Sequence, residues 1–120
     1  MKNKDIIIIE KIIGYCAQVR EALDMFDNDF LKFKVSSVFQ NACCMCILQI
    51  GELCKLVSSE LRNNEKAIPW REWCGIRDVF AHQYSNVDLE SAWDTIQNDL
   101  PELEREMKRI YEKIKYNNKN

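Results

Sequence analysis

Apolar residues recur along most of the chain at steps of three and four positions, the spacing that returns a helix to the same face. The first such stretch runs from about residue 4 to residue 26, and Lys11, Gln18 and Glu21 occupy its opposite side. Its apolar stripe consists of Ile8, Ile9, Ile12, Cys16, Val19, Leu23 and Phe26. The pattern predicts an amphipathic helix, and Asp27-Asn28-Asp29 predicts its end, because these residues favour caps and turns.

A second, longer helix is predicted from about Phe30 or Val35 to Leu61. Its apolar face is broad, which suits the centre of a helical bundle: Val38, Ala42, Cys46, Leu53, Leu56 and Val57, widened by Phe39, Ile50 and Leu61. Gln49 falls inside this face and Glu52 at its edge, so both side chains need polar partners. For Glu52 two alternatives stay open, which are an ion pair with Arg77 and solvation at the rim.

A third helix is predicted from about Pro69, since proline suits the first helical position, to between Tyr84 and Val87. On a regular helix one stripe collects Trp70, Trp73, Arg77, Phe80 and Tyr84. Arg77 therefore interrupts an aromatic seam at a position where a core side chain is expected. Because burying an unpaired guanidinium is costly, Arg77 must meet an anion, an acidic partner or water.

Asp88 is expected to cap a fourth helical segment, in which apolar residues recur at regularly alternating steps of four and three positions. This seam suits shallow packing along another helix and consists of Leu89, Trp93, Ile96, Leu100, Leu103, Met107, Ile110 and Ile114. Pro101 predicts a kink or a split into two roughly collinear helices, and residues from about 117 to 120 are expected to fray. Residues 1–120 are thus predicted to form a single all-α domain, an up-and-down bundle of four to five helices.

Charge and cysteine usage narrow the classes of function. The net charge is −2, so no overall positive field attracts nucleic acid, and any binding of a polyanion must be local. The six cysteines occur without an apolar secretory leader. We therefore expect a cytoplasmic protein with reduced, buried thiols. The uncharged run from Val35 to Gly51 contains serine, asparagine and glutamine and is shorter than the about 20 mostly apolar residues of a membrane span, so we expect a core helix and no membrane partner.

Candidate chemistry concentrates between Arg77 and Tyr84, a stretch that contains the only histidine, His82. One histidine does not complete the usual metal-ligand sets and no Gly-rich phosphate loop occurs, so neither a metal nor a cofactor is expected. An arginine and a histidine suit cleavage of a phosphodiester without metal, because His82 can move a proton at neutral pH and Arg77 can stabilise charge on phosphate oxygens. RNA supplies its own nucleophile, the 2′-hydroxyl. The pair alone is permissive rather than specific.

The order of these residues, Arg77-x4-His82-x-Tyr84, resembles the signature of the HEPN superfamily, and within it that of the HepT-like toxins. The similarity extends from about Asn41 to the C-terminus. It covers Ile50-Gly51-Glu52, Ile68-Pro69-Trp70, Gly75-Ile76-Arg77-Asp78, Val87-Asp88, Trp93 and Asp99-Leu100-Pro101-Glu102-Leu103.

This resemblance implies a helical homodimer that cuts RNA without metal and is encoded beside a minimal nucleotidyltransferase antitoxin. It implies that Arg77 and His82 are catalytic, that Asp78 supports them, and that Tyr84 carries the hydroxyl to which the antitoxin adds AMP. Gln83 departs from the pattern, since relatives commonly carry glycine at this position, and it restricts the backbone between the histidine and the tyrosine.

Helix geometry adds a condition to this hypothesis. Arg77 and His82 point about 140° apart on a regular helix, so either the helix unwinds near His82 or two chains assemble the site. We favour a two-fold axis beside the stripe that holds Trp73, Arg77, Phe80 and Tyr84, which would collect two copies of each catalytic residue. Two alternatives remain: a non-catalytic HEPN-type module that binds nucleotide, RNA or a nucleotidyltransferase, and a structural bundle in which Arg77 pairs with Glu52 and His82 caps a helix.

Overall fold

A computed structural model of the chain describes residues 3–77, 80 and 88–119. Every regular element within these residues is helical, which confirms the all-α class. The elements are α1 (Asn3–Met25), α2 (Phe30–Val35), α3 (Ser37–Lys55), α4 (Ser59–Asn64), α5 (Trp70–Cys74), α7 (Leu89–Asp94), the π-helical segment η1 (Thr95–Asp99) and α8 (Leu100–Lys119).

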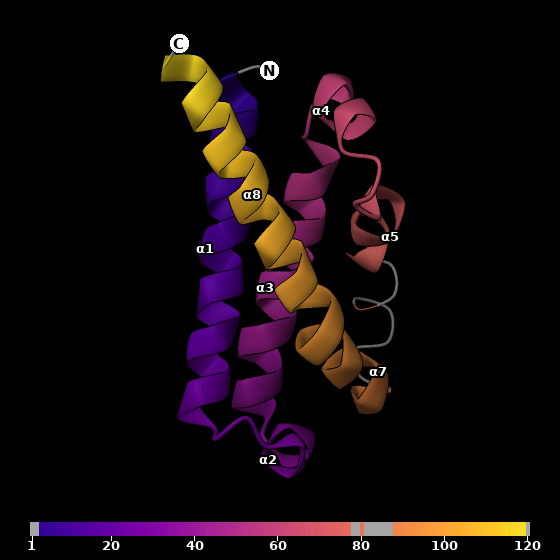
Figure 1. Cartoon of the computed structure of the whole chain (residues 1–120). Helices are drawn as coiled ribbons and strands as arrows, with labels where there is room; N and C mark the ends of the chain where they lie inside the picture. The colour runs from indigo at the N-terminus through magenta and orange to yellow at the C-terminus, as the bar shows by residue number, and fades with distance from the viewer. Residues whose placement is uncertain (1–2, 78–79, 81–87, 120) are drawn as a thin grey trace.

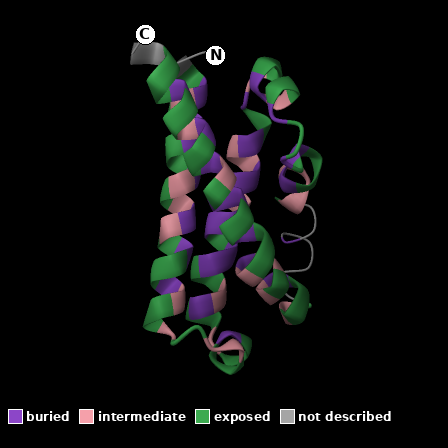
Figure 2. Cartoon of the chain, viewed as in Figure 1, coloured by how far each residue is buried: buried purple, intermediate pink, exposed green. Residues whose placement is uncertain are grey.

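Helix α1 packs against both α3 and α8, and these three long helices hold most of the core (Figure 1). The apolar stripe predicted for α1 is buried from Ile8 to Val19 and half-buried at Leu23 and Phe26. The seam predicted for the last segment is half-buried at Leu89 and Trp93 and buried from Ile96 to Ile114. Figure 2 shows buried positions alternating with exposed ones along each of the long helices, as amphipathic elements require. Both predictions are confirmed.

The expected second helix is three helices, because two serines act as caps. Ser36 has an extended backbone (φ −103°, ψ 111°), and its Oγ accepts a hydrogen bond from the Phe39 N–H at 3.1 Å, which starts α3. Ser58 caps α4 in the same way through the Leu61 N–H. The buried carboxylate of Asp5 accepts hydrogen bonds from the Ser58 N–H at 3.0 Å and from its hydroxyl at 2.6 Å, which ties the start of α4 to α1. Serine side chains compete with the helix for backbone amides, so they favour these breaks.

The apolar face predicted for the second helix is confirmed at Phe39, Cys46, Ile50, Val57 and Leu61, which are buried, and is wrong at Val38, Ala42 and Leu56. Val38 is 69% exposed and Leu56 57% exposed. The buried side of α3 is made by Phe39, Cys43, Cys44, Cys46, Ile47, Ile50, Gly51 and Cys54. Phe39 sets this orientation, since its ring stacks on Phe26 at 4.4 Å and meets Phe33 at 5.2 Å, and an aromatic ring buries more area than valine.

The cysteines behave as predicted. All six thiols are free; five are buried, and Cys74 is half-buried. Helix α3, which carries four of the buried thiols, is the one helix among the described residues that is long and apolar enough to cross a membrane by length and composition. A core helix of a bundle meets the same criterion, and α3 buries its thiol-rich side against the neighbouring helices, as expected for a core helix.

The start and the interruption of the last segment are also confirmed. Asp88 caps α7, because its carboxylate accepts a hydrogen bond from the Ser91 N–H at 3.2 Å. The interruption lies one turn before Pro101, where the Leu100 N–H donates to the Thr95 carbonyl and forms the wider π-helical turn. A proline ring crowds the carbonyl of the residue four positions earlier, and a wider turn relieves this. Helix α8 then continues to Lys119, through residues that were expected to fray.

Candidate nucleic-acid site

Arg77 is not in a core position, contrary to the expectation from a continuous third helix. Helix α5 ends at Cys74 and Gly75 forms a turn (φ −89°, ψ −1°), after which Ile76 and Arg77 are helical again. This turn shifts the helical phase, so Arg77 no longer continues the stripe of α5. The side chain of Arg77 is 58% exposed. The aromatic members Trp70, Trp73 and Phe80 are buried within the chain.

Arg77 instead forms an ion pair with Glu52 at the end of α3. Its Nη1 donates a hydrogen bond to Glu52 Oε1 at 2.7 Å, while Lys55 Nζ lies 2.8 Å from Glu52 Oε2. Of the two alternatives for Glu52, the structure shows the pair with Arg77. The pKa of Glu52 is held below its ordinary value, first by the hydrogen bond from Lys55; desolvation opposes this, and the charge of Lys55 and the contact with Arg77 add to the lowering. The Glu52 carboxylate is therefore ionised and forms ion pairs with both Lys55 and Arg77.

Gly51 allows α5 to come close enough for this pair to form. A Cβ atom at this position would lie 2.6 Å from Ile76 Cγ2 and 2.8 Å from the Trp73 carbonyl oxygen. Real Cβ atoms essentially never approach so closely, so only glycine fits between α3 and the turn at Gly75. The residue just before the carboxylate thus sets the distance between the helix that bears Glu52 and the segment that bears Arg77.

The other end of α5 is fixed to α8. Trp70 Nε1 donates a hydrogen bond to the Glu65 carbonyl at 3.0 Å. The buried Glu65 carboxylate meets Arg109 Nη2 at 2.5 Å and Lys113 Nζ at 3.5 Å. Arg109 and Lys113 together hold the pKa of Glu65 below its ordinary value, with the Arg109 hydrogen bond as the largest cause. The segment that leads to Arg77 is therefore anchored at its start.

The structure brings together two of the predicted site residues, Arg77 and Glu52. Asp78, His82 and Tyr84 lie outside the described residues, as does the departure at Gln83. Lys55 was not among the predicted residues, although its position three residues after Glu52 on one helix places it on the same surface. In the described ranges, 3–77, 80 and 88–119, no group of histidine, cysteine, aspartate and glutamate side chains is placed to hold a metal ion.

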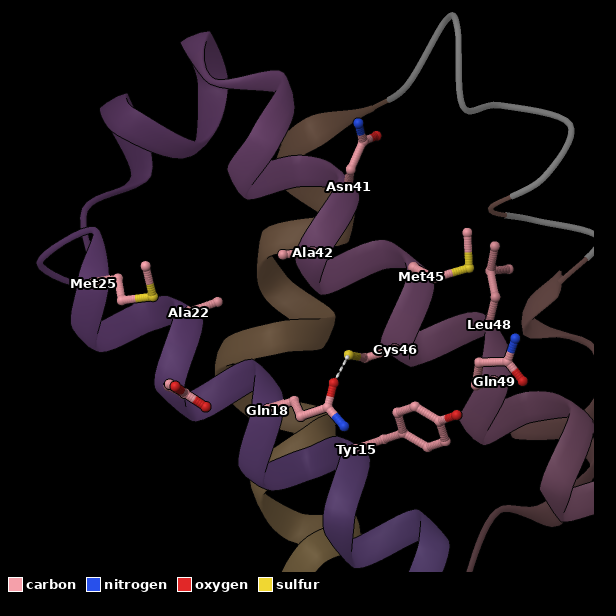
Figure 3. A pocket seen from close by; sticks show the side chains of 11 residues that line it. Tyr15, Gln18, Ala22, Met25, Asn41, Ala42, Met45, Cys46, Leu48 and Gln49 are labelled. Carbon is pink, nitrogen blue, oxygen red and sulfur yellow. Dashed lines mark hydrogen bonds between the residues drawn. The ribbon is translucent and has the colours of Figure 1, made fainter.

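A groove lies between α1 and α3 (Figure 3). Tyr15, Gln18 and Met25 line it from α1, and Met45 and Leu48 line it from α3. Met25 is 73% exposed and Met45 57% exposed. Along α3, positions 38, 45, 49, 52 and 56 follow one another at helical spacing, so this exposed apolar face runs into the surface of the Arg77–Glu52 pair.

The chain matches the model of the ribonuclease HepT-like family over residues 7–110. It is 36% identical over 108 residues to a protein named "Putative RNase" from Caldanaerobacter subterraneus subsp. tengcongensis. The aligned residues cover 89% of this chain and 94% of that protein. It is 27% identical over 101 residues to "Probable ribonuclease HepT" of Thermococcus cleftensis, covering 80% of this chain and 92% of the relative. No solved structure matches the chain significantly. Together with the shared length, the family match shows that the chain belongs to the HepT-like ribonuclease family.

Proposed function

We propose that this protein is the toxin of a toxin-antitoxin pair and acts as a metal-independent endoribonuclease that uses Arg77 and His82. The observation that carries the proposal is the exposed guanidinium of Arg77, which Glu52 holds at the surface within the segment that resembles the family signature. Family membership and the names of the relatives support ribonuclease activity as its class.

In the proposed reaction Arg77 binds the non-bridging oxygens of a phosphodiester and stabilises the charge that develops on them. The ribose 2′-hydroxyl attacks the neighbouring phosphorus, a bond from the 2′-oxygen to phosphorus forms, and the bond from phosphorus to the 5′-oxygen breaks. His82 transfers the proton that the 2′-hydroxyl loses and the 5′-oxygen gains. Asp78 is proposed to orient the imidazole, because residues four positions apart are neighbours on a regular helix.

The exposure of the Arg77–Glu52 pair argues against the purely structural alternative. Ion pairs between exposed side chains contribute little to stability, because solvent screens them and ordering the side chains costs entropy. An arginine that only fastened the fold would be expected on a buried carboxylate, as Arg20 is on Glu104 and Arg109 is on Glu65. A surface guanidinium fixed in place is better suited to receive an anion from solution.

We propose that the active form is a homodimer that associates through the exposed face of α3. Trp73 and Phe80 are buried within the chain, so the proposed two-fold axis runs along α3 and not beside the stripe that holds these two residues. Val38 and Met45 are exposed on α3 before Glu52, and Leu56 is exposed at the C-cap of the same helix. Contiguous exposed apolar side chains mark association surfaces, and a dimer built here would bring two Arg77 sites toward one another.

Regulation is proposed to follow the pattern that the family resemblance implies. A cognate minimal nucleotidyltransferase in the cytoplasm would transfer AMP from ATP to Tyr84: the phenolic oxygen loses its proton and bonds to the α-phosphorus, and the bond from that phosphorus to pyrophosphate breaks. The added group places bulk and negative charge seven residues after Arg77, where it competes with the RNA phosphate for the guanidinium. Co-expression with the neighbouring gene should add an AMP-sized mass to the intact chain, and Tyr84→Phe should lack it.

Cleavage of RNA in the presence of EDTA tests the ribonuclease proposal. The purified wild-type protein should cut, and Arg77→Ala and His82→Ala should each remove the activity. Arg105→Ala serves as a matched control, because Arg105 is exposed on α8 and forms no part of the site. Equal cutting by His82→Ala and wild type would refute the mechanism. Binding of RNA without cutting by the wild-type protein would instead support the non-catalytic binding module.

A further inference from the structure

Three clusters in this structure share one composition, a glutamate that meets an arginine and a lysine. Glu104 meets Arg20 at 2.7 Å and Lys108 at 3.2 Å. Glu65 meets Arg109 and Lys113. The third cluster is Arg77–Glu52–Lys55, with both nitrogen-to-oxygen distances below 3 Å.

The three clusters differ in the exposure of the carboxylate. The side chains of Glu104 and Glu65 are 10% and 7% exposed, whereas that of Glu52 is 37% exposed. The first two glutamates connect elements that are far apart in sequence, since Arg20 lies on α1 and Arg109 on α8. The cations of all three clusters are exposed to a similar extent: 58% for Arg77 and 47% for Lys55, against 55% for Arg20 and for Lys108. The exposed carboxylate is therefore what distinguishes the Glu52 cluster, because it keeps two accessible cations side by side at the surface instead of fixing them to a buried group.

Charge and geometry at the Glu52 cluster suit a phosphodiester. Two cations and one carboxylate leave a net charge of one positive unit, which one phosphodiester neutralises. Arg77 and Lys55 end on different oxygens of the same carboxylate, so both nitrogens are already directed toward one small anionic group with two oxygens. Each cation carries several N–H donors, so each can hold Glu52 and bind a further oxygen. A phosphate presents the same kind of paired acceptors as a carboxylate.

The surface on the other side of α5 has the opposite charge. A cavity between α5 and the η1–α8 segment has Trp73 and Ile76 in its wall and is lined by four carboxylates, those of Glu72, Asp99, Glu102 and Glu106. This surface repels a polyanion. An RNA strand that reaches Arg77 therefore meets favourable charge on the α3 side, where Lys55 lies, and unfavourable charge on the α8 side.

We propose that Lys55 is a second phosphate-binding residue of the RNA site and that Arg77 and Lys55 form a two-cation phosphate seat held by Glu52. The proposal rests on the proposed function for the identity of the anion, and it adds a residue and a direction to that site. The RNA backbone enters along the end of α3, and Lys55 contributes to binding rather than to proton transfer.

Salt-dependent RNA binding by the full-length chain tests this assignment. All variants carry His82→Ala so that bound RNA stays intact, and a single-stranded RNA is titrated at several salt concentrations. Each phosphate contact contributes about 0.7 to the slope of log Kd against log salt for a single strand. Lys55→Ala should reduce this slope by about that amount and weaken binding roughly three- to tenfold. Lys55→Arg should restore both quantities, because it returns the charge.

Lys108→Ala is the matched control, since it removes the same charge from the same kind of cluster at a buried carboxylate. It should leave the slope and the affinity at the parent value. Equal slopes for Lys55→Ala and Lys108→Ala would overturn the phosphate seat, as would a parent protein that does not bind RNA. Urea unfolding of each variant identifies any loss of affinity that comes from loss of fold.

The outcome for Lys55 is separable from that of the ribonuclease proposal. If the wild-type protein binds RNA without cutting it and Lys55→Ala reduces the salt slope, the phosphate seat stands and the ribonuclease proposal fails. If the wild-type protein cuts RNA in EDTA and Lys55→Ala binds as tightly as the parent with the same slope, the ribonuclease proposal stands and Lys55 is not a phosphate ligand.

Discussion

Gly51 and Ile76 approach each other so closely that a Cβ on Gly51 would lie 2.6 Å from Ile76 Cγ2. Gly51→Ala should therefore push the Arg77 segment away from α3 and destabilise the fold by about 1–3 kcal/mol, the usual cost of overpacking. RNA cleavage should fall as well, because Arg77 moves relative to Glu52. Urea unfolding and a cleavage assay measure the two effects.

Gly14 offers the matched control for that substitution. It lies within α1, and a Cβ there would meet nothing within 4 Å. Gly14→Ala should raise the free energy of unfolding by about 0.5–1 kcal/mol, because alanine loses less conformational entropy in a helix, and should leave cleavage unchanged. If Gly51→Ala proves as stable and as active as Gly14→Ala, the close approach does not position Arg77.

Glu52→Ala should separate the role of this residue in the site from any role in stability. Without the carboxylate, Arg77 and Lys55 are no longer held together, so kcat should fall by about tenfold or more, as for other losses of positioning. The free energy of unfolding should stay close to that of wild type, because the pair is exposed. A large loss of stability with unchanged kcat per folded molecule would favour the structural alternative for Arg77.

Acid should weaken the attachment of α8 to the rest of the bundle. Burial raises the pKa of Glu104, but the hydrogen bonds from Arg20 and Lys108 outweigh this and hold the pKa below its ordinary value of 4.5. Because the pKa of Glu104 is lower in the folded chain than in the unfolded chain, the unfolded chain binds more protons in acid. The stability that the ionised Glu104 contributes is therefore present above about pH 4.5 and is lost as the pH falls through the folded pKa.

Urea unfolding between pH 7 and pH 3 measures that dependence. Glu104→Gln should flatten it, because the amide does not titrate, while Glu112→Gln, an exposed change on the same helix, should follow wild type. Parallel acid curves for wild type and Glu104→Gln would show that the Arg20–Glu104 pair does not contribute to the acid sensitivity.

Thiol labelling should report on the cysteine-rich core. Burial raises the pKa of Cys16, Cys43 and Cys54 to about 12, so at pH 8 these residues are protonated as well as inaccessible. An aromatic disulfide reagent should react with the half-buried Cys74 first and with the other five thiols only after unfolding. Rapid reaction of several thiols in the native protein, with Cys74→Ser as the reference, would contradict this core.

The proposed dimer surface can be tested by one charged substitution. Wild type should be a dimer by light scattering at micromolar concentration, and Met45→Glu should be a monomer, because it places a charge in the exposed apolar face of α3. Leu31→Glu makes the same change at a residue of α2 that is 69% exposed and should remain dimeric. A wild-type monomer would remove the α3 interface and the composite site with it.

The long amphipathic helices were predictable because one-sided apolar patterns determine which face is buried. This was so for α1 and for the segment from Asp88 to the end of α8, including the interruption next to Pro101. The face of α3 was predicted only in part, because Val38 and Phe39 both fit an apolar stripe and only the ring contacts with Phe26 and Phe33 select Phe39 as the buried residue. The caps at Ser36 and Ser58 were missed because serine is common inside apolar helices as well.

For the site, the sequence correctly offered Glu52 as a partner of Arg77 but placed Arg77 in the core. That error came from a single residue, since the turn at Gly75 interrupts the helix two residues before Arg77. Lys55 escaped notice because a lysine near a glutamate is common on helix surfaces, and only the shared carboxylate distinguishes it. The roles of Asp78, His82 and Tyr84 remain predictions, because these residues lie outside those that the structure describes.

Helix α3 combines a thiol-lined buried side with an outer side that leads from Val38 to Glu52. A genetic screen for inactive variants should therefore find many substitutions in this one helix, for unrelated reasons. Those at Cys43, Ile47 and Ile50 should reduce the amount of folded protein in the cell. Those on the outer side should leave protein levels normal. The side of α3 on which a substituted residue lies should therefore be enough to separate the two classes of variant.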